Sequence, residues 1–232
     1  NPEFEFNDKV FLEIIELRKN GYPIEYIFEE VYFYGEQFYI KEGVLIPRDD
    51  TEPLIDISLR WIPYYVNQEK KLTIAEIGVG SGIISTIIAK KFQNRKDITF
   101  IATDINPIAL EVTKQNLAKH NVNIKLYLTN LLDGVEESID IIISNPPYVE
   151  EEWENEQLKY EPKEAIFAKD NGTYLLKKIV KEGIRRGVKL IICEMGYNQK
   201  ELTKNFFDSL KLNNYSFYKD LSGNDRGFIL KF

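Results

Sequence analysis

Short apolar runs alternate with longer amphipathic segments between about residue 72 and residue 210. Each run has five to seven residues and is rich in Ile, Leu or Val, which is typical of strands buried on both faces of a sheet. The segments between the runs carry apolar residues at helical spacing. This alternation predicts a parallel sheet with helices on both faces, with strands at 72–77, 98–104, 124–128, 139–144 and 188–194 and helices at 83–92, 107–120, 173–185 and 198–210.

The residues before this region have a different pattern. Residues 8–20 place apolar side chains on one helical face, and the aromatic segment 31–47 is interrupted twice by turn residues, which predicts a hairpin. We expect a further helix from about residue 52 that ends at Pro63. We therefore divide the chain into an N-terminal part, 1–66, and a main domain, 67–232. The remaining predicted elements are a long loop at 148–172 and a final antiparallel pair of strands at 215–220 and 228–232.

A glycine-rich turn follows the first buried strand. Alternating glycines allow a tight turn and let a ligand approach the bare backbone. The helix that begins after the turn would favour a negatively charged group at its N-terminus. We expect a cofactor here, although the same pattern fits a plain turn in another α/β protein. The residues of the turn are Gly78, Val79, Gly80, Ser81 and Gly82.

Polar residues at the ends of the predicted strands refine the choice of cofactor. A dinucleotide fold usually has the spacing G-x-G-x-x-G, whereas this chain has E-x-G-x-G-x-G, with Glu76 as the acid. Glu76 could accept a hydrogen bond from an ammonium group, which S-adenosylmethionine has and NAD lacks. Asp104 ends the next strand, where an acid can hold both hydroxyls of a ribose. Asn130 follows the third strand and is either an adenine contact or a turn residue.

The tetrapeptide Asn145-Pro146-Pro147-Tyr148 follows the fourth buried strand, on the same rim as the glycine turn. Its two prolines restrict the backbone, so a rigid loop can present the Asn145 side-chain oxygen and a main-chain carbonyl as fixed acceptors. Two such acceptors match the two hydrogens of an NH₂ group, and Tyr148 could stack on a flat amide or base. By itself the tetrapeptide also fits a rigid turn. Together with the glycine turn and Asp104, it favours methylation of an amide or amine nitrogen.

Composition narrows the class of protein. A net charge of −7 disfavours a broad phosphate-binding face, although a local basic strip is compatible with it. One cysteine and one histidine allow no internal disulfide, zinc cluster or Ser-His or Cys-His machinery. Neither a membrane-spanning run nor a signal peptide is recognisable, so we expect a cytoplasmic protein without membrane association. As a separate expectation, we take the protein to be a monomer.

Residues 21–232 resemble the HemK/PrmC family of protein-glutamine methyltransferases. NPPY is shared with amino-methyltransferases that act on DNA, whereas the IPR–TE and YEP–A–DNG segments are more specific to HemK-type enzymes. The stretches that carry the resemblance are GYPIEYIFEE, GVLIPRDDTE, EIGVGSG, TDINPIAL, SNPPYV, YEPKEAIFAKDNG, EMG and GNDR.

The resemblance implies a class I S-adenosylmethionine-dependent methyltransferase fold, a Rossmann-like sheet of seven mostly parallel strands with an antiparallel C-terminal strand. It implies methyl transfer from S-adenosylmethionine, with S-adenosylhomocysteine as product, to a glutamine side-chain amide. The usual target is the Gly-Gly-Gln motif of a peptide chain release factor. By this resemblance, Gly78 to Gly82 line the methionine and ribose side of the cofactor, Asp104 binds the ribose, Asn130 and Leu131 flank the adenine, Asn145 to Tyr148 hold the glutamine amide, and Thr51 lies near the methionine end.

Three departures from the family pattern bear on these assignments. Asn130 stands where the family usually has an acid, and Asp49 stands where a proline is expected. Family members also begin with a helical domain that helps to grip the release factor, of which residues 8–20 represent one helix.

Four functions stay open at this point. The leading one is methylation of a release-factor glutamine. A second is methylation of another glutamine, as in a ribosomal protein, or of an exocyclic amine of DNA or RNA. The acidic net charge of the chain argues against DNA or RNA as the substrate. A third is an NAD-dependent oxidoreductase, which the glycine spacing disfavours. The fourth is an inactive module that binds the cofactor without turnover.

Overall fold

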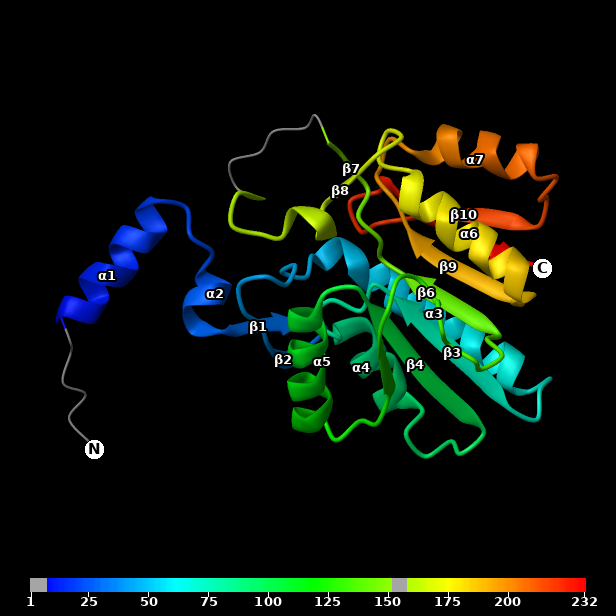
Figure 1. The fold of residues 1–232 in the computed structure, drawn as a ribbon, viewed down its shortest axis with the longest axis horizontal. Coiled ribbons are helices and arrows are strands. Elements are labelled where there is room, and N and C mark those ends of the chain that lie inside the picture. Colours follow the sequence, from blue (N-terminus) through cyan, green and yellow to red (C-terminus); the bar gives the residue numbers. More distant parts are fainter. Residues whose placement is uncertain (1–7, 152–157) are drawn as a thin grey trace.

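The main sheet has seven strands in the order β10-β11-β9-β6-β3-β4-β5 (Figure 1). The computed structural model describes residues 8–151 and 158–232. Strands β9, β6, β3, β4 and β5 are parallel, whereas β11 runs against both of its neighbours. This confirms the predicted fold class. The strands are β3 (Leu72–Ile77), β4 (Ile98–Asp104), β5 (Lys125–Leu128), β6 (Ile141–Ser144), β9 (Leu190–Glu194), β10 (Tyr215–Lys219) and β11 (Asp225–Lys231).

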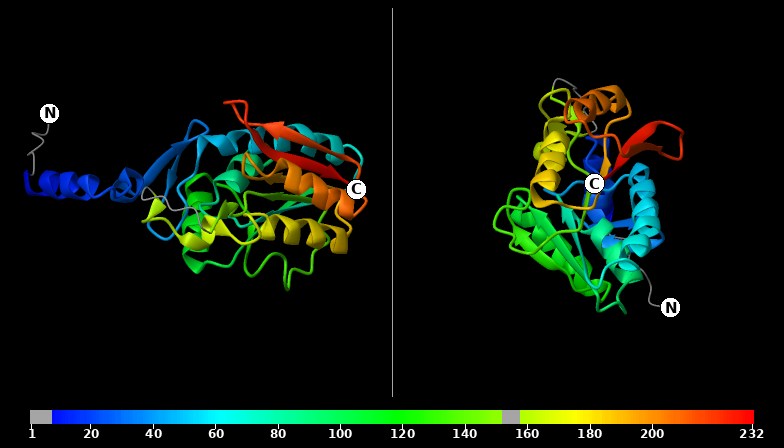
Figure 2. Two further views of the ribbon diagram at one scale, coloured as in Figure 1. Left: turned by 90° about the horizontal axis from the view of Figure 1, so that it is seen from above. Right: turned by 90° about the vertical axis from the view of Figure 1, so that its right-hand side faces the viewer.

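Helices cover both faces of this sheet, and the two views of Figure 2 show the sheet between them. One buried cluster joins α3 (Glu52–Val66) and α4 (Ile83–Lys91) to one face, and α5 (Pro107–Lys119) extends this layer over β4 and β5. A second cluster joins α6 (Tyr174–Arg186) and α7 (Lys200–Ser209) to the other face. These helices place their apolar stripes on the sheet because neither face can be left in water.

The pleat of β3 decides which side chains reach which layer. Ile74 belongs to the cluster under α3 and α4, whereas Ala75 and Ile77 belong to the cluster under α6. Because side chains alternate along a strand, Glu76 faces α4, where its carboxylate accepts the backbone N–H of Ser85 at 2.9 Å and the Ser85 hydroxyl. Glu76 is buried there.

The N-terminal elements lie at one end of the sheet (Figure 1). The predicted hairpin is confirmed, and Asn116 of α5 bonds the N–H and the carbonyl of Tyr39 at 2.7 and 2.9 Å. The predicted first helix is also confirmed, but none of its residues is buried. These elements are α1 (Asp8–Lys19), α2 (Ile24–Phe28), β1 (Glu30–Phe33) and β2 (Glu36–Tyr39).

Two predicted boundaries were wrong by three residues. Helix α3 does not end at Pro63 but continues to Val66, because Tyr65 and Val66 pack into the core and the N–H of Asn67 bonds the carbonyl of Pro63. The last strand begins at Asp225 rather than residue 228, since Asp225 already pairs with Lys219. The expected long loop contains three short elements, β7 (Val149–Glu150), η3 (Lys163–Ala165) and β8 (Phe167–Ala168), while its residues 152–157 lie outside the described part.

Helix α3 belongs to the predicted N-terminal part, 1–66, but it packs into the core of the main sheet. The division of the chain into 1–66 and 67–232 stays a prediction. Within the described part of the chain, every helix is too short or too polar to cross a bilayer.

Glu76 makes stability depend on pH. Burial raises its pKa from 4.5 to about 8, against the opposing effect of the Ser85 hydrogen bonds. The folded chain therefore holds this proton more tightly than the unfolded chain, so the free energy of unfolding falls as pH rises from about 4.5 to 8, by at most about 1.4 kcal/mol per pH unit. We expect Glu76→Gln, which keeps an acceptor for Ser85, to flatten this decline in urea unfolding at pH 5 to 8.

The matched control is Glu13→Gln on the exposed helix α1, which should keep the wild-type slope. Identical slopes in the wild type and Glu76→Gln would show that Glu76 does not titrate in this range.

Candidate active site

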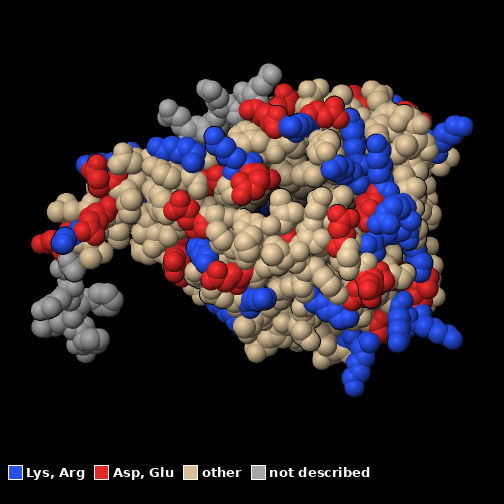
Figure 3. Space-filling model, in the orientation of Figure 1, with Lys and Arg blue, Asp and Glu red and all other residues tan. Residues whose placement is uncertain are grey.

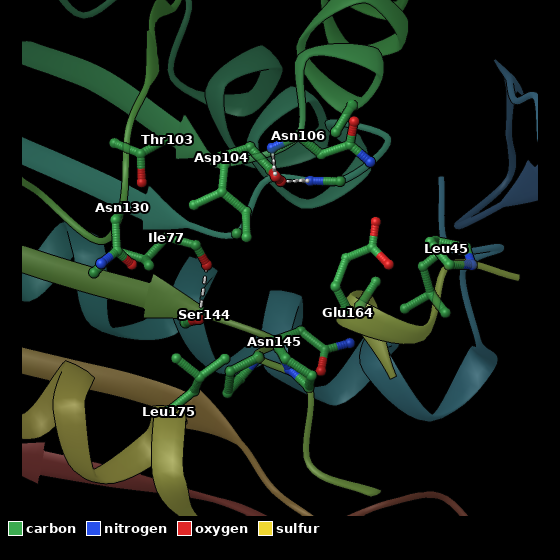
Figure 4. Close-up of a pocket in the computed structure, with 18 of the residues that line it drawn as sticks. Leu45, Ile77, Thr103, Asp104, Asn106, Asn130, Ser144, Asn145, Glu164 and Leu175 are labelled. Atoms are coloured by element: carbon green, nitrogen blue, oxygen red, sulfur yellow. Dashed lines mark hydrogen bonds between the residues drawn. The ribbon is translucent and has the colours of Figure 1, made fainter. Parts of the chain in front are cut away.

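A pocket lies at the carboxyl ends of β3, β4 and β6, where the chain reverses its direction of progress through the sheet. The empty space in and above it is about 820 Å³, part of which is open solvent. Figure 4 shows side chains from β3, β4, β6, η3 and α6 around it.

The glycine turn forms one wall of the pocket, and its glycines have different roles. Gly78 and Gly80 line the pocket with φ of 75° and 55°, and a Cβ at either would meet no atom within 4 Å. Their bare backbone thus leaves room for a ligand. A Cβ on Gly82 would instead lie 2.8 Å from the Thr113 side chain, so this glycine allows α4 and α5 to pack closely.

Asp104 lies directly beside this turn. Its Oδ2 accepts the N–H of Gly80 at 2.9 Å, and its Oδ1 accepts the N–H of Asn106 at 2.8 Å (Figure 4). Burial raises the pKa of Asp104, which these backbone hydrogen bonds partly oppose. The carboxylate is therefore fixed at the pocket wall and retains lone pairs for ligand hydroxyls.

Besides Thr51 and Gly82, three residues predicted at the cofactor do not line the pocket. Glu76 is turned to Ser85 beneath α4, so its side chain is not placed to meet a ligand's ammonium group. Val79 is buried among α4 and α5 side chains, and the carbonyl of the buried Ser81 accepts a hydrogen bond from Asn116 at 2.8 Å. These residues support the turn on the side away from the pocket. The spacing of the motif could not distinguish this role from contact with a ligand.

Asn130 and Leu131 line the far end of the pocket, beyond β5. Leu131 has a φ of 50°, an uncommon backbone conformation for a non-glycine residue. The N–H of Thr129 bonds the carbonyl of Asp104 at 2.8 Å, which places this segment against the end of β4.

Asn145, Pro146 and Pro147 form the wall opposite Asp104, directly after β6. The Ser144 hydroxyl donates to the carbonyl of Ile77 at 2.7 Å and thereby joins the end of β6 to the end of β3. Tyr148 is not among the lining residues, because its hydroxyl is directed to Glu194 at 2.9 Å.

Thr51 lies behind the pocket wall. It is buried at the end of η1 (Asp49–Thr51), and its Oγ1 accepts the Asn145 Nδ2 at 3.1 Å. Thr51 therefore does not line the pocket, although the resemblance implied a place beside the cofactor, and spacing along the chain gave no sign of its bond to Asn145 across 94 positions.

Glu161 was missed as a site residue, although it belongs to the YEP stretch that carries the family resemblance. It is buried, pairs with Arg48 and accepts the N–H of Ile46 at 3.0 Å. Glu161 thus fastens the segment after the hairpin to the segment of Pro162, Glu164 and Ala165, which lines the pocket. Ile46 and Arg48 belong to the stretch GVLIPRDDTE and Glu161 to YEPKEAIFAKDNG. The presence of both stretches in one sequence was the signal from which a contact between them could have been expected.

The ionisable side chains that line the pocket in the described part of the chain are both acids, Asp104 and Glu164. Glu164 extends into the space between Asn145 and Asn106 (Figure 4). Lys and Arg side chains gather instead around α6, on the right of the surface in Figure 3. Two carboxylates without a lining cation suit a sulfonium with an ammonium group and disfavour a pyrophosphate.

Comparison with known proteins agrees with this geometry. Residues 55–182 match the family model described as the methyltransferase small domain. The chain is 34% identical to a release factor glutamine methyltransferase of Clostridium botulinum, over 97% of this chain and 82% of that protein. It is 35% identical to another from Dictyoglomus turgidum, over 92% of this chain and 77% of that protein.

The chain belongs to the release factor glutamine methyltransferase family. Solved structures share its fold at low sequence identity. A methyltransferase from Pyrococcus furiosus has a TM-score of 0.56 at 19% identity and covers 95% of this chain and 98% of its own. The N-terminal domain of human METTL16 in complex with SAH has a TM-score of 0.57 at 17% identity, over 82% of this chain and 73% of that one.

A substitution of Asp104 tests most directly whether this pocket wall binds the cofactor. We expect Asp104→Ala to weaken S-adenosylmethionine binding at least about tenfold, because it removes a charged acceptor at the pocket wall. Isothermal titration calorimetry measures this, with Asp208→Ala on the exposed face of α7 as control. Unchanged affinity in Asp104→Ala would refute the assignment of the ribose to this carboxylate.

Proposed function

We propose that this chain transfers a methyl group from S-adenosylmethionine to the side-chain amide nitrogen of a protein glutamine, the Gly-Gly-Gln glutamine of a peptide chain release factor. The observation that supports this most is the rigid Asn145-Pro146-Pro147 wall opposite Asp104 in one pocket. Membership of the family supports the choice of substrate. On the same proposal, the protein acts as a monomer in the cytoplasm.

The pocket divides into a cofactor side and a substrate side. On the cofactor side, Gly78 and Gly80 leave their backbone bare and Asp104 holds the ribose, while Asn130 and Leu131 flank the adenine. On the substrate side, the Asn145 side-chain oxygen and the Pro146 carbonyl accept the two hydrogens of the glutamine amide. The proximity of the two sides would bring nitrogen and methyl group together.

The chemical difficulty lies in the amide nitrogen. Its lone pair is delocalised into the carbonyl, so it is a poor nucleophile. S-adenosylmethionine, when bound, supplies a methyl group made electrophilic by the positive charge on sulfur. Two acceptors outside the amide plane favour a pyramidal nitrogen whose lone pair points at that methyl group.

The atoms and electrons of the methyl transfer balance without a further reactant. A carbon–nitrogen bond forms as the carbon–sulfur bond breaks, and the nitrogen gives up one proton to water. The bonding electrons of the broken bond stay on sulfur, which becomes neutral. Asn145 and Pro146 act by position, since neither has to take the proton.

A transfer assay with labelled S-adenosylmethionine tests the proposal. It offers a release factor with Gly-Gly-Gln, the same protein with Gly-Gly-Ala, a glutamine-containing ribosomal protein and adenine-containing duplex DNA. We expect label on the Gly-Gly-Gln protein alone. Label on the DNA or the ribosomal protein, or on nothing while the cofactor still binds, would overturn the proposal.

Asn145→Ala tests the amide clamp. We expect a loss of turnover of at least about 100-fold, because one of the two acceptors is removed, with S-adenosylmethionine affinity nearly unchanged. Single-turnover transfer and calorimetric titration separate these effects. A fully active Asn145→Ala protein would rule out the clamp, and a large loss of cofactor affinity would place Asn145 on the cofactor side instead.

A further inference from the structure

We propose that Gln199 is a positioning residue that fixes the end of the loop 145–148 and thereby aims the Pro146 carbonyl at the substrate amide. This inference rests on the proposed function, in which that carbonyl is one of the two acceptors. It also gives a role to the EMG stretch, which Gln199 follows, and to the DNG end of YEPKEAIFAKDNG, neither of which lines the pocket.

The peptide unit between Tyr148 and Val149 is held at both of its polar atoms. The Tyr148 carbonyl accepts a hydrogen bond from Gln199 Nε2 at 2.7 Å. The N–H of Val149 donates to the carbonyl of Ile166 at 2.9 Å, beside the short parallel pair of β7 and β8. Because a peptide unit is planar, bonds at both its oxygen and its N–H fix the orientation of the whole plane. The loop after β6 therefore ends in a fixed plane.

The two prolines make this fixed end decisive for the Pro146 carbonyl. At the other end of the loop, Ser144 pairs with Cys193 in the main sheet. The proline rings lock φ at positions 146 and 147, so few torsion angles are left between the two fixed ends. The direction of the Pro146 carbonyl depends on those few angles. If the Tyr148 end were released, Pro146 and Pro147 could turn about ψ and move the carbonyl away from the substrate.

Gln199 is itself immobile. Only 1% of it is exposed, and it directly precedes α7. Its Oε1 accepts the N–H of Gly196 at 2.8 Å, and its Nε2 donates to the carbonyls of Tyr148 and Asn171 at 2.7 and 3.0 Å. The amide thus uses its oxygen on a donor and its NH₂ on two acceptors, so a half-turn would oppose like groups on both sides. One orientation of the amide is therefore selected.

The turn 170–172 is built to reach the same amide. Asp170, Asn171 and Gly172 have φ of 59°, 53° and 76°, a left-handed run that is unfavourable for the two non-glycine residues. A Cβ on Gly172 would collide with the carbonyl oxygen of Tyr148. Glycine therefore lets the turn approach the loop so closely that one Gln199 amide bonds a carbonyl of each. The turn and Gln199 together support the loop from the side away from the pocket.

Gln199→Met tests the inference, because methionine keeps the length of the side chain but has no N–H to donate. We expect kcat on the Gly-Gly-Gln protein to fall at least about tenfold, with S-adenosylmethionine affinity within about threefold of wild type, since the displaced carbonyl belongs to the substrate side. The matched control is Gln115→Met on the exposed face of α5, which should keep both values. A wild-type kcat in Gln199→Met would overturn the inference.

Gly172→Ala disturbs the same peptide unit from the other side and should lower kcat at least about tenfold. Its control is Gly187→Ala at the end of α6, where φ is 67° and a Cβ would meet no atom within 4 Å. This control imposes similar backbone strain without a collision and should keep the wild-type kcat. Equal losses of kcat in the two variants, or a loss of cofactor affinity as large as the loss of kcat, would indicate general destabilisation and contradict the inference.

A measurement without substrate separates this inference from the proposed function. Hydrogen exchange of the Val149 backbone N–H, followed by NMR in ¹⁵N-labelled protein, reports how firmly the peptide unit is held. We expect exchange at least about tenfold faster in Gln199→Met than in wild type or Gln115→Met. Equal rates would refute the fixed plane. If the wild type fails to label Gly-Gly-Gln, the proposed function falls, while the exchange rates still decide whether Gln199 fixes the loop.

Discussion

The parallel pairing of β3 with both β4 and β6 is the constraint on which the site depends. Three polypeptide segments that are far apart in the sequence end at one rim because these strands run side by side in one direction. The glycine turn, Asp104 and Asn145 follow those ends directly. The main-chain hydrogen bonds between these strands therefore also fix the distances across the pocket. In addition, the Ser144 hydroxyl donates to the carbonyl of Ile77 and joins the ends of β6 and β3 at the rim.

Behind this rim lies a second layer of polar groups that never reach the pocket. Glu161, Glu194 and Arg226 are buried, and each contacts a segment that follows a strand elsewhere in the chain: Ile46 after β2, Tyr148 after β6 and Asp50 after β2. Burying a charge is costly unless it is paired or hydrogen-bonded, so these side chains hold their partners firmly. Burial raises the pKa of Glu194 to about 7, and the Thr51 and Tyr148 hydroxyls and Arg226 lower it in opposition. A loop fixed from behind in this way can offer rigid acceptors to a substrate.

Much of the fold could be predicted from the sequence, because fully buried strands and amphipathic helices have distinct patterns. The boundaries were less certain. Pro63 was expected to end α3, but the packing of Tyr65 and Val66 outweighs the one hydrogen bond that a proline omits. Asp104, Asn130, Leu131 and Asn145 were predicted at the site and do line one pocket.

The sequence by itself determined the layered α/β sheet, the positions of the glycine turn and of Asn145-Pro146-Pro147-Tyr148, and the family. Only the tertiary structure decided which side chains face the pocket. Glu76 and Tyr148 stand in the motifs beside pocket residues, yet the pleat of β3 directs Glu76 to Ser85, and Glu194 draws the Tyr148 hydroxyl away. The physical reason is that a motif fixes where the backbone goes, whereas the direction of a side chain depends on partners from distant parts of the chain.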